Sequence, residues 1–368
     1  MRIAYDYQIF GEHQYGGVSR YFFELASTIA RFPGNDVGVV SPLYVNEYLA
    51  AASSPLRVLG RKVPALPRTG RIYLSINRLL APSYLARFQP DLVHETYYLR
   101  KRFAPVASKV ALTVFDMIHE RCPETFGPDD QMSAIKAAAI GRADHLFCIS
   151  EHTKRDLIEI LGVAERKITV TYLAVSPLPA PSCSASSLVG SSPYLLHVGG
   201  RQGYKNFPAF LRAYAASPWL QQSFRVVCFG SGALTALERA LMAELGIPEA
   251  SVIQVSGGDD VLAAFYQGAA ALVYPSQYEG FGIPPLEAMS QGCPVICSRA
   301  TSIPEVVGEA GAYFDPQDVD SIRDALEQTL QSESVREGLI EAGHQRSQGF
   351  SWDRCARETL SAYRELLQ

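Results

Sequence analysis

Residues 274–298, YPSQYEGFGIPPLEAMSQGCPVICS, combine the signals of a strand, a turn, a helix and a second strand. The apolar run ALVYPS, which leads into this segment, predicts the first strand, and EGFG predicts the turn. Pro284 and Pro285 suit the first turn of a helix, where a proline costs no hydrogen bond. PVICS, at the end, predicts the second strand. A strand, a helix and a strand in this order are typical of a parallel sheet.

The same alternation runs along nearly the whole chain of 368 residues. Short apolar runs such as RIAYDY, KVALTVFD and FRVVCFG are separated by stretches of helical periodicity. In VSRYFFELASTIARF, for example, Tyr21, Leu25 and Ile29 fall on one helical face. The pattern predicts an α/β protein of two doubly wound domains that face a central cleft, with ligands at the carboxyl ends of the strands.

Composition indicates where the domains meet. The segment SPLPAPSCSASSLVGSSP, Ser176 to Pro193, is rich in proline and serine and lacks periodicity, which is typical of a mobile linker. We therefore expect an N-terminal domain over 1–176, a linker over 177–193 and a C-terminal domain over 194–349. A terminal helix over 350–368 is expected to pack back on the N-terminal domain.

The overall composition argues against several classes of protein. With a formal net charge of −4 and no basic, aromatic nucleic-acid signature, the chain is not expected to bind nucleic acid. The seven cysteines contain no CxxC pair, which favours free thiols in a reducing compartment over disulfides or a zinc site. The start MRIAYDYQIF lacks the apolar core of a signal peptide, and no apolar run is long enough to cross a bilayer. We expect a cytoplasmic protein, or one at the inner face of the cell membrane.

Two glycine turns follow predicted strands and precede helices. Gly16 and Gly17, in GEHQYGGVSRYF, would let the backbone approach a ligand closely, and the next helix would offer N–H groups to an anion. In HVGGRQGYKNF, Gly200 is followed by Arg201 and Lys205, two cations that can neutralise a diphosphate. The alternative interpretation is an ordinary turn in the first case and a solvated basic loop in the second.

The segment 274–298 adds two carboxylates to these turns. Gly280 and Gly282 would expose backbone N–H groups near the start of a helix, with Glu279 on the turn and Glu287 projecting from the helix. The alternative is that both acids only favour the helix N-terminus electrostatically, a stabilisation of about 0.3 to 1 kcal/mol.

Together these motifs resemble a known family. The first glycine turn, the GGRxxxK turn and above all EGFGIPPLE, with acids eight positions apart, resemble the retaining glycosyltransferases of family 4, which have the GT-B fold. SEHTKRDL and PEVVGEAGAYFDPQD extend the resemblance over nearly the whole chain. It implies two Rossmann-like domains, of which the N-terminal one binds the acceptor and the C-terminal one binds a nucleotide sugar.

The resemblance also implies roles for the residues of a donor site. Glu287 would hold the ribose hydroxyls of the nucleotide, and Glu279 would hold the donor sugar together with the backbone of its turn. Arg201 and Lys205 would bind the diphosphate. The expected donor-binding residues are Gly16, Gly17, Gly200, Arg201, Lys205, Glu279, Gly280, Phe281, Gly282 and Glu287.

Neither a metal ion nor another cofactor is expected. Breaking the anomeric C–O bond leaves charge on the diphosphate, and fixed cations can stabilise that charge without a divalent ion. The adjacent acids Asp259 and Asp260, in SGGDDVL, are interpreted as caps of the next helix rather than as metal ligands.

In the first domain, the strand end TVFDMIHERCPETF carries the candidate catalytic side chains. Many members of the resembled family have a histidine directly before the aspartate, whereas this chain has Phe115. We expect Asp116 first, and His119 second, to orient or deprotonate the acceptor hydroxyl, with Glu279 as the catalytic residue on the donor side. The alternative for His119 is a packed, hydrogen-bonded structural residue.

VHETYY supplies two further candidates, His94 and Glu95, for contact with the acceptor. Both lie near the end of a predicted strand, where doubly wound sheets bind their ligands. The alternative interpretation is a strand end that is buried among tyrosines.

Basic residues outnumber acids between Arg57 and Lys109, where the only acids are Asp91 and Glu95. Interleaved with IYLSINRLL and YLARF, they predict a surface that contacts anionic lipid or a diphosphate-linked acceptor. The alternative is a solvated basic face. These basic residues are Arg57, Arg61, Lys62, Arg68, Arg71, Arg78, Arg87, Arg100, Lys101, Arg102 and Lys109.

The resemblance implies transfer of a hexose, with retention, from a nucleotide diphosphate sugar to a saccharide or lipid-linked saccharide acceptor in polysaccharide biosynthesis. DMIHE and HETYY are similar to mannosyl- and deoxymannosyltransferases of O-antigen assembly, which favours GDP-mannose as the donor. The alternatives are a UDP-sugar-dependent transferase, a nucleotide-sugar epimerase of the same fold, and a catalytically silent saccharide- or nucleotide-binding subunit.

Overall fold

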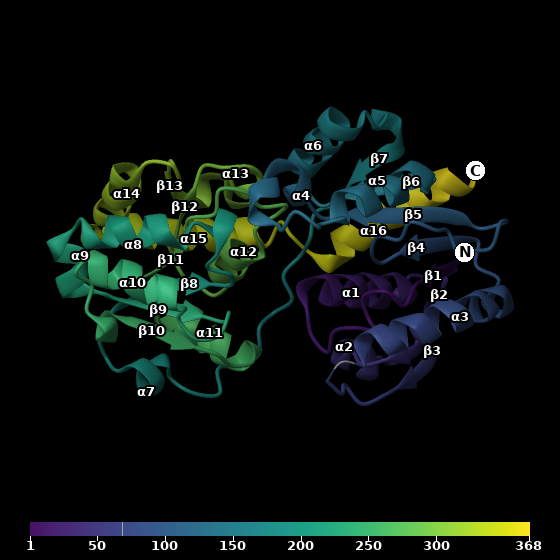
Figure 1. The fold of residues 1–368 in the computed structure, drawn as a ribbon, viewed down its shortest axis with the longest axis horizontal. Helices are drawn as coiled ribbons and strands as arrows, with labels where there is room; N and C mark the ends of the chain where they lie inside the picture. The colour runs from purple at the N-terminus through teal and green to yellow at the C-terminus, as the bar shows by residue number, and fades with distance from the viewer. Residues whose placement is uncertain (68) are drawn as a thin grey trace. The chain divides into compact units, whose positions relative to one another are not determined.

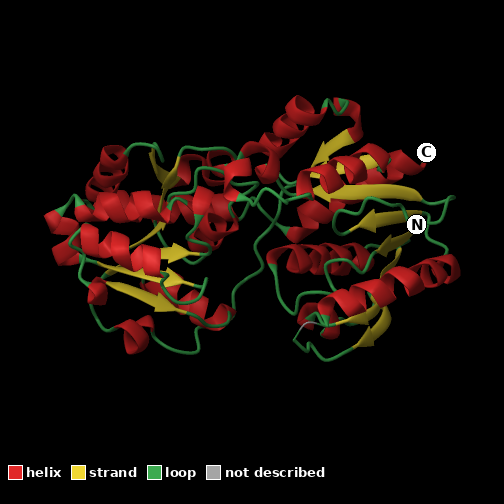
Figure 2. Ribbon diagram, viewed as in Figure 1, coloured by secondary structure: helices red, strands yellow, loops and turns green. Residues whose placement is uncertain are grey.

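The computed structural model describes residues 1–67 and 69–368 (Figure 1). The chain forms two compact units: unit 1 comprises Met1–Ala174 and Ser351–Gln368, and unit 2 comprises Val175–Phe350. Each unit holds one parallel sheet with helices on either side of it, as Figure 2 shows. The predicted α/β class with two doubly wound domains is thereby confirmed.

The sheet of unit 1 has seven strands in the order β3-β2-β1-β4-β5-β6-β7. The strand order reverses between β1 and β4, which are paired in parallel. Doubly wound sheets bind ligands at such a switch point, beyond the carboxyl ends of the strands. The strands are β1 (Arg2–Tyr5), β2 (Asp36–Tyr44), β3 (Arg57–Lys62), β4 (Leu92–Glu95), β5 (Lys109–Val114), β6 (His145–Cys148) and β7 (Ile168–Val170).

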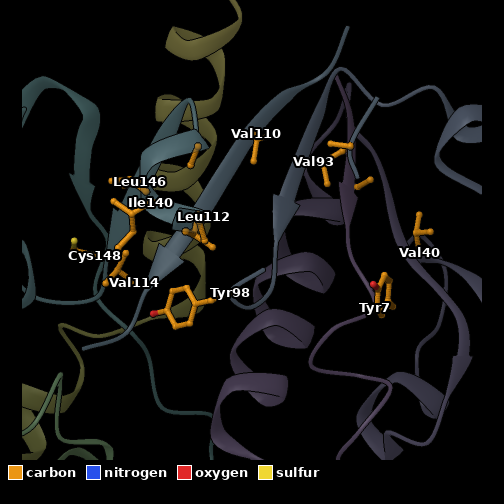
Figure 3. Close-up of a cluster of buried hydrophobic side chains, with 14 of the residues drawn as sticks. Tyr7, Val40, Val93, Tyr98, Val110, Leu112, Val114, Ile140, Leu146 and Cys148 are labelled. Carbon is orange, nitrogen blue, oxygen red and sulfur yellow. The ribbon is translucent and has the colours of Figure 1, made fainter. Parts of the chain in front are cut away.

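The helices of unit 1 cover this sheet with apolar faces. One part of the core joins Val93, Val110 and Leu146 of neighbouring strands to Ile140 of α5, as Figure 3 shows. The helices are α1 (Gly17–Arg31), α2 (Glu47–Ala50), α3 (Gly70–Phe88), α4 (Ile118–Arg121), α5 (Met132–Arg142), α6 (Glu151–Leu161) and α16 (Trp352–Leu367), with the 3-10 turns η1 (Pro123–Thr125) and η2 (Glu165–Lys167).

The C-terminal helix α16, drawn in yellow in Figure 1, belongs to unit 1 and packs against α1. Ser351 caps its start by accepting a hydrogen bond from the backbone N–H of Arg354 at 3.3 Å. Its buried face includes Cys355, Leu360 and Tyr363, which are spaced as one side of a helix. Helix α16 is therefore attached to unit 1 by burial of one apolar face.

Unit 2 has a six-stranded parallel sheet in the order β10-β9-β8-β11-β12-β13, with its switch point between β8 and β11. Its strands are β8 (Tyr194–Val198), β9 (Arg225–Phe229), β10 (Val252–Val255), β11 (Ala271–Tyr274), β12 (Val295–Ser298) and β13 (Gly311–Phe314). Its helices are α7 (Ala185–Val189), α8 (Phe207–Ala215), α9 (Pro218–Ser223), α10 (Ala236–Glu244), α11 (Asp259–Gly268), α12 (Ile283–Ser290), α13 (Ile303–Val307), α14 (Val319–Gln331) and α15 (Glu333–Ser347), with η3 (Gly203–Lys205), η4 (Glu249–Ser251) and η5 (Gly308–Ala310).

The expected linker over 177–193 differs from what the structure contains. The segment falls within unit 2, which begins at Val175, and it includes the short helix α7. Ala185 and Val189, one helical turn apart, are buried and attach α7 to its unit, where it contacts α11. The serine- and proline-rich composition of the segment gave no sign of this single helical turn with its two buried apolar residues.

Candidate functional site

The loops that follow β8 and β11, at the switch point of unit 2, are joined to each other by backbone contacts. The N–H of Gln277 donates to the carbonyl oxygen of Tyr204 at 2.7 Å. Asn206, at the start of α8, donates through Nδ2 to the carbonyl oxygen of Pro275 at 3.2 Å. These bonds hold the η3 turn beside the loop that carries EGFG.

Within this pair of loops, Lys205 and Glu279 form an ion pair. Lys205 Nζ lies 2.7 Å from Glu279 Oε1, and the two side chains are 22% and 12% exposed. The ammonium also lies 5.1 Å from the ring centroid of Tyr204 and 5.9 Å from that of Tyr274. A Cβ added at Gly200 would lie 3.4 Å from Lys205 Cγ, so the glycine leaves room for the lysine. The structure thus brings together three predicted donor-site residues around a charge pair that reaches solvent.

The turn that carries Glu279 is held in place by Ser302. Its Oγ donates to the carbonyl oxygens of Glu279 and Phe281, each at 2.8 Å. Gly282 has a φ of 117°, a conformation that favours glycine, and α12 begins directly after it. Gly280 lies within the same turn, and Phe281 is buried. The turn is therefore preorganised ahead of the N-terminus of α12.

Glu287 lies in the second turn of α12 and is almost completely buried. Its Oε2 accepts a hydrogen bond from the Tyr266 hydroxyl at 2.9 Å. Burial, reinforced by the adjacent carboxylate, raises the pKa of Tyr266 well above its ordinary value. The phenol therefore remains a proton donor that positions Glu287. Sequence analysis missed Tyr266, because nothing in its local pattern separates it from an apolar residue of α11.

Arg201 does not join the Lys205–Glu279 pair, in contrast to the diphosphate contact expected for it. Its side chain is buried, and Nε lies 2.7 Å from Glu238 Oε1. Its Nη2 donates to the carbonyl oxygens of Gly232 and Ala233 at 3.1 and 3.0 Å. Glu238 also completes the capping box of α10, which presents its carboxylate to the guanidinium. The arginine therefore holds the loop after β9 to α10.

In unit 1, Asp116 follows β5 and is contacted by a buried lysine that sequence analysis missed. The Asp116 carboxylate is about one-third exposed, whereas the Lys136 side chain is 1% exposed. Lys136 Nζ donates to the Asp116 carbonyl oxygen at 3.0 Å and to Glu120 Oε2 at 2.9 Å, and lies 3.6 Å from Asp116 Oδ1. A buried ammonium needs such partners, so Lys136 fixes the turn that presents Asp116.

His119 is directed toward Asp130 rather than toward Asp116. Its Nδ1 lies 2.8 Å from Asp130 Oδ2, and its ring stacks on Phe126 with the centroids 3.8 Å apart. The hydrogen bond to His119 lowers the pKa of Asp130. Phe115, at the position where many members of the family have a histidine, packs edge-on against Tyr21 with the ring centroids 5.5 Å apart. The ring of Phe115 is thereby part of an aromatic cluster with Tyr21 and Phe22.

His94 and Glu95, the expected acceptor contacts, are both fully buried. His94 Nε2 lies 2.8 Å from Thr113 Oγ1, and its Nδ1 is hydrogen-bonded to the Tyr363 hydroxyl. Glu95 pairs with the Arg142 guanidinium, with Nη1 2.6 Å from Oε1. Burial lowers the pKa of His94 to about 3 and raises that of Glu95 to about 7. Because β4 is an inner strand of the sheet, both residues serve the interior of unit 1 instead.

The switch point of unit 1 holds Asp6, which sequence analysis also missed. This fully buried carboxylate accepts hydrogen bonds from the backbone N–H groups of Gln8 and Thr96, each at 3.1 Å. The Gln8 amide and the Thr96 hydroxyl donate to it at 2.6 and 2.5 Å. Burial raises the pKa of Asp6. An aspartate directly after the first strand, in RIAYDY, was the available signal.

Two predicted helix starts are observed. Gly16 precedes α1, and its carbonyl oxygen accepts from the Ser19 hydroxyl at 2.9 Å. Apart from its chain neighbours and the backbone of α1, nothing lies within 4 Å of a Cβ added at Gly17, and a ligand role for Gly16 and Gly17 stays a prediction. Helix α11 begins at Asp259, so both acids of SGGDDVL lie in its first turn, but the N-cap residue is Gly258 and no side chain caps the helix, in contrast to the expected role of the acids.

The basic segment from Arg57 to Lys109 includes residues that are engaged within unit 1. Arg57 and Lys62 pair with acids. Arg68 lies outside the described residues, and contact of this segment with lipid or acceptor stays a prediction.

Two family models match the chain, one in each half. Glycosyltransferase Family 4 matches residues 15–177, and Glycosyl transferases group 1 matches residues 184–346. The chain is 31% identical over 373 residues to an O-antigen chain mannosyltransferase B of Escherichia coli, covering 95% of this chain and 96% of that protein. It is 32% identical over 245 residues to a serotype-specific mannosyltransferase of the same organism, covering 63% of this chain and 30% of that protein.

Solved structures share the fold at low sequence identity. A sucrose-phosphate synthase from Thermosynechococcus elongatus superposes with a TM-score of 0.77 at 20% identity, covering 100% of this chain and 99% of that one. A glycosyltransferase from Rickettsia africae superposes with a TM-score of 0.69 at 15% identity, covering 100% and 98%. Together with the family models, these matches confirm the predicted GT-B fold, and the chain belongs to the family 4 glycosyltransferases, the group 1 glycosyl transferases.

Proposed function

We propose that this glycosyltransferase is a retaining mannosyltransferase that uses GDP-mannose and extends a saccharide or lipid-linked saccharide acceptor in polysaccharide assembly. The proposal is supported by the relative named as an O-antigen chain mannosyltransferase, which is 31% identical along 96% of its length. A deoxymannose in place of mannose would use the same donor chemistry.

The observation that carries the proposal is the Lys205–Glu279 ion pair at the switch point of unit 2. Transfer breaks the bond between the anomeric carbon and the diphosphate, so negative charge grows on the leaving group while positive charge grows on the sugar ring. We assign Lys205 to the diphosphate and Glu279 to the sugar. Preorganised charges of this kind stabilise a transition state without reorganising as the reaction proceeds.

The remaining residues of the proposed donor site act through the nucleotide. Glu287, positioned by Tyr266, accepts hydrogen bonds from the ribose hydroxyls. The N–H groups that follow Gly282 lie at the start of α12, where a helix favours an anion. Arg201 contributes indirectly, since its guanidinium is engaged by Glu238 and by loop carbonyls.

On the acceptor side, we assign Asp116 to orient or deprotonate the acceptor hydroxyl. Its carboxylate reaches solvent at the end of β5, and Lys136 holds the turn beneath it. His119 is the second candidate, and its contact with Asp130 suits it to positioning that loop. No metal ion is required in this scheme, because Lys205 supplies the charge opposite the diphosphate.

The deciding experiment offers the protein GDP-mannose, GDP-deoxymannose and a set of UDP-sugars, with and without saccharide acceptors, and follows products by mass spectrometry. We expect a mannosylated acceptor only with GDP-mannose, and NMR of the new linkage should show the anomeric configuration of the donor. Thermal shift complements the assay, since a ligand at 100 times its Kd adds about 2.7 kcal/mol of stability.

Other results would point elsewhere. Release of an altered nucleotide sugar without any acceptor would indicate an epimerase, and transfer from a UDP-sugar would replace GDP-mannose as the donor. A stabilising shift with no product from any donor would indicate a silent binding subunit and would contradict the proposal.

A further inference from the structure

Unfavourable backbone conformations in unit 2 are concentrated at the carboxyl edge of its sheet. Among the described residues, four that are not glycine have a positive φ, and three of them lie in unit 2: Asn206, Ser231 and Thr301. They come after β8, β9 and β12, which belong to one parallel sheet (Figure 1). A side chain disfavours a positive φ sterically, and such residues cluster at functional sites. Their positions therefore point to a functional constraint on the edge that carries Lys205 and Glu279.

Thr301 has the most unfavourable conformation of the three. Its φ is 51°, and threonine is branched at Cβ, which makes a positive φ a genuine outlier. It lies in a reverse turn that is closed by a bond from the Ile303 N–H to the Ala300 carbonyl oxygen at 3.1 Å. The next residue, Ser302, has a φ of −83°. A positive φ followed by a negative one is the pattern of a type II′ turn, whose first central position is usually glycine. A threonine at this position needs a compensating contact.

The side chain of Thr301 makes such a contact with the turn that carries Glu279. Thr301 Oγ1 accepts a hydrogen bond from the Glu279 N–H at 2.9 Å. The neighbouring hydroxyl of Ser302, which is fully buried, is shared between the carbonyl oxygens of Glu279 and Phe281. The two adjacent hydroxyls therefore hold both backbone polar groups of Glu279.

The carboxylate of Glu279 is held separately from its backbone. Oε1 lies 2.7 Å from Lys205 Nζ, and the Tyr274 hydroxyl is also hydrogen-bonded to this side chain. These partners fix the end of the side chain, whereas Thr301 and Ser302 fix the backbone from which it starts. A displacement of about 1 Å at a reacting group can cost roughly 100-fold in rate, so the backbone anchor bears on the reaction.

We propose that Thr301 is a positioning residue for Glu279. Its unfavourable φ directs Oγ1 to the Glu279 N–H, and this bond places the carboxylate that faces the donor sugar. Thr301 itself contacts no substrate in this assignment and acts through Glu279. The inference rests on the proposed function, in which Glu279 contacts the sugar. If the turn only had to connect β12 to α13, glycine would replace Thr301 without loss, because glycine adopts a positive φ at no steric cost.

The test separates the hydroxyl of Thr301 from its backbone conformation. Thr301→Val keeps the branched shape without the hydroxyl, Thr301→Ser keeps the hydroxyl, and Thr301→Gly removes both the hydroxyl and the unfavourable φ. In Thr301→Val, we expect kcat for transfer from GDP-mannose to a saccharide acceptor to fall roughly 2- to 13-fold, the range that one neutral hydrogen bond gives. Thr301→Gly should lose at least as much, although it should unfold at a higher urea concentration than Thr301→Val. Thr301→Ser should transfer like the wild type.

Two further measurements do not depend on transfer. Amide hydrogen exchange at Glu279, followed by NMR, should quicken in Thr301→Val and Thr301→Gly, because the N–H loses its acceptor, and should stay as in the wild type in Thr301→Ser. Calorimetric affinity for GDP should be unchanged in all three variants, since GDP lacks the sugar. If the wild type transfers no mannose, the proposed function alone is contradicted, and amide exchange still tests the positioning role.

Two matched controls lie outside the donor site. Thr169→Val removes a half-buried hydroxyl of unit 1 that is bonded to His145 Nε2 at 2.8 Å. Gln89→Gly replaces a residue with a φ of 52° at the end of α3. Both control proteins should transfer like the wild type, and Gln89→Gly should be at least as stable, because glycine suits the left-handed end of a helix.

The inference is overturned if Thr301→Val transfers like the wild type, or if Thr301→Ser or Thr169→Val loses as much as Thr301→Val. It is also overturned if transfer in the three Thr301 variants follows their stability, because Thr301 would then be a structural residue. A fall in GDP affinity that matches the fall in transfer would place the effect on the nucleotide and would likewise contradict it. Should Thr301→Val not fold, the comparison of Thr301→Gly with Thr301→Ser decides the same question.

Discussion

The switch points of the two units share a topology but differ in the kind of polar group they contain. In unit 2, Lys205 and Glu279 form a charge pair that reaches solvent. In unit 1, Asp6 directly follows the first strand at the switch point, where it is fully buried and receives four hydrogen bonds. A carboxylate whose acceptors are filled from within its own unit has little capacity for a ligand. The two switch points therefore differ in accessibility, and it is the accessible pair of unit 2 to which we assign the ligand-facing role.

The largest expected effect comes from removing the ligand-facing cation. Lys205→Ala should raise the activation free energy of transfer by about 2.7 to 4 kcal/mol, which lowers the rate roughly 100- to 1,000-fold, because charge on the leaving diphosphate is left unstabilised. Steady-state kinetics would measure this loss, with Lys101→Ala as the control for an exposed lysine outside the site. A rate within a few-fold of wild type would remove Lys205 from the mechanism.

Substitution of the buried Asp6 should lower the stability of unit 1. Asp6→Ala leaves the donors of Gln8 and Thr96 without an acceptor, and each unsatisfied buried group costs about 1 to 3 kcal/mol. We expect the free energy of unfolding of unit 1, measured with urea, to fall by about 3 kcal/mol. The affinity of the folded protein for GDP, measured by calorimetry, should be retained. If the variant unfolds like the wild type but loses GDP binding, Asp6 has a binding role and the structural role assigned to it is wrong.

Substitutions of the two acids of the 274–298 segment should have different effects on nucleotide binding. Glu287→Ala should weaken GDP binding by about 1.5 to 3 kcal/mol, the value of a charge-assisted hydrogen bond. Glu279→Gln should leave GDP affinity intact or increase it, because Lys205 loses its competing carboxylate, while transfer falls. Isothermal titration beside a transfer assay would measure both. Equal weakening by the two substitutions would disprove the division of roles.

A smaller effect concerns the buried histidine of unit 1. Burial lowers the pKa of His94 to about 3, so the unfolded state takes up a proton below pH 6.5 that the folded state does not. Stability from this group is complete above pH 6.5 and falls by about 1.4 kcal/mol per pH unit between there and pH 3. Wild type should thus lose about 2 kcal/mol more between pH 7 and pH 5 than His94→Gln. Denaturation of both proteins at the two pH values measures the difference, and equal losses would contradict it.

The smallest expected effect is that of removing metal ions. Because we assign the diphosphate charge to Lys205, transfer should proceed at the same rate after exhaustive treatment with EDTA. Adding magnesium or manganese to the treated protein should change the rate less than twofold. A twofold change in rate corresponds to roughly 0.4 kcal/mol in activation free energy. A strict requirement for either ion would mean that a cation other than Lys205 acts at the ligand-facing switch point.

Much of the fold was predictable because its signals are local. The start of α12 at Ile283 follows from two prolines that suit a first turn, and Gly282 before it has the positive φ that glycine tolerates best. The pairing of Lys205 with Glu279 was only half predictable. Both residues follow strands that a doubly wound sheet places side by side, but their direct contact depends on the conformation of two loops.

The contacts that were missed join residues distant in sequence. Arg201 was expected to face the diphosphate, yet Glu238, 37 positions later, engages its guanidinium. His94 was expected to contact the acceptor, yet it bonds to Tyr363, 269 positions later. Lys136 was overlooked because a lysine in an amphipathic helix normally points to solvent. No local periodicity encodes such partners.

The amino-acid sequence by itself determined the alternation of strands and helices, the glycine turns and the acidic motif, because steric preference and hydrophobic periodicity act over a few residues. Tertiary structure decided which charges remained accessible. Asp6 and Arg201 were buried and bonded to polar groups of their own units, whereas the Lys205–Glu279 pair stayed accessible to solvent. Burying a charge without a partner carries a large desolvation cost, so a buried charge needs a polar partner. Those partners are distant in sequence, and only the folded chain brings them together.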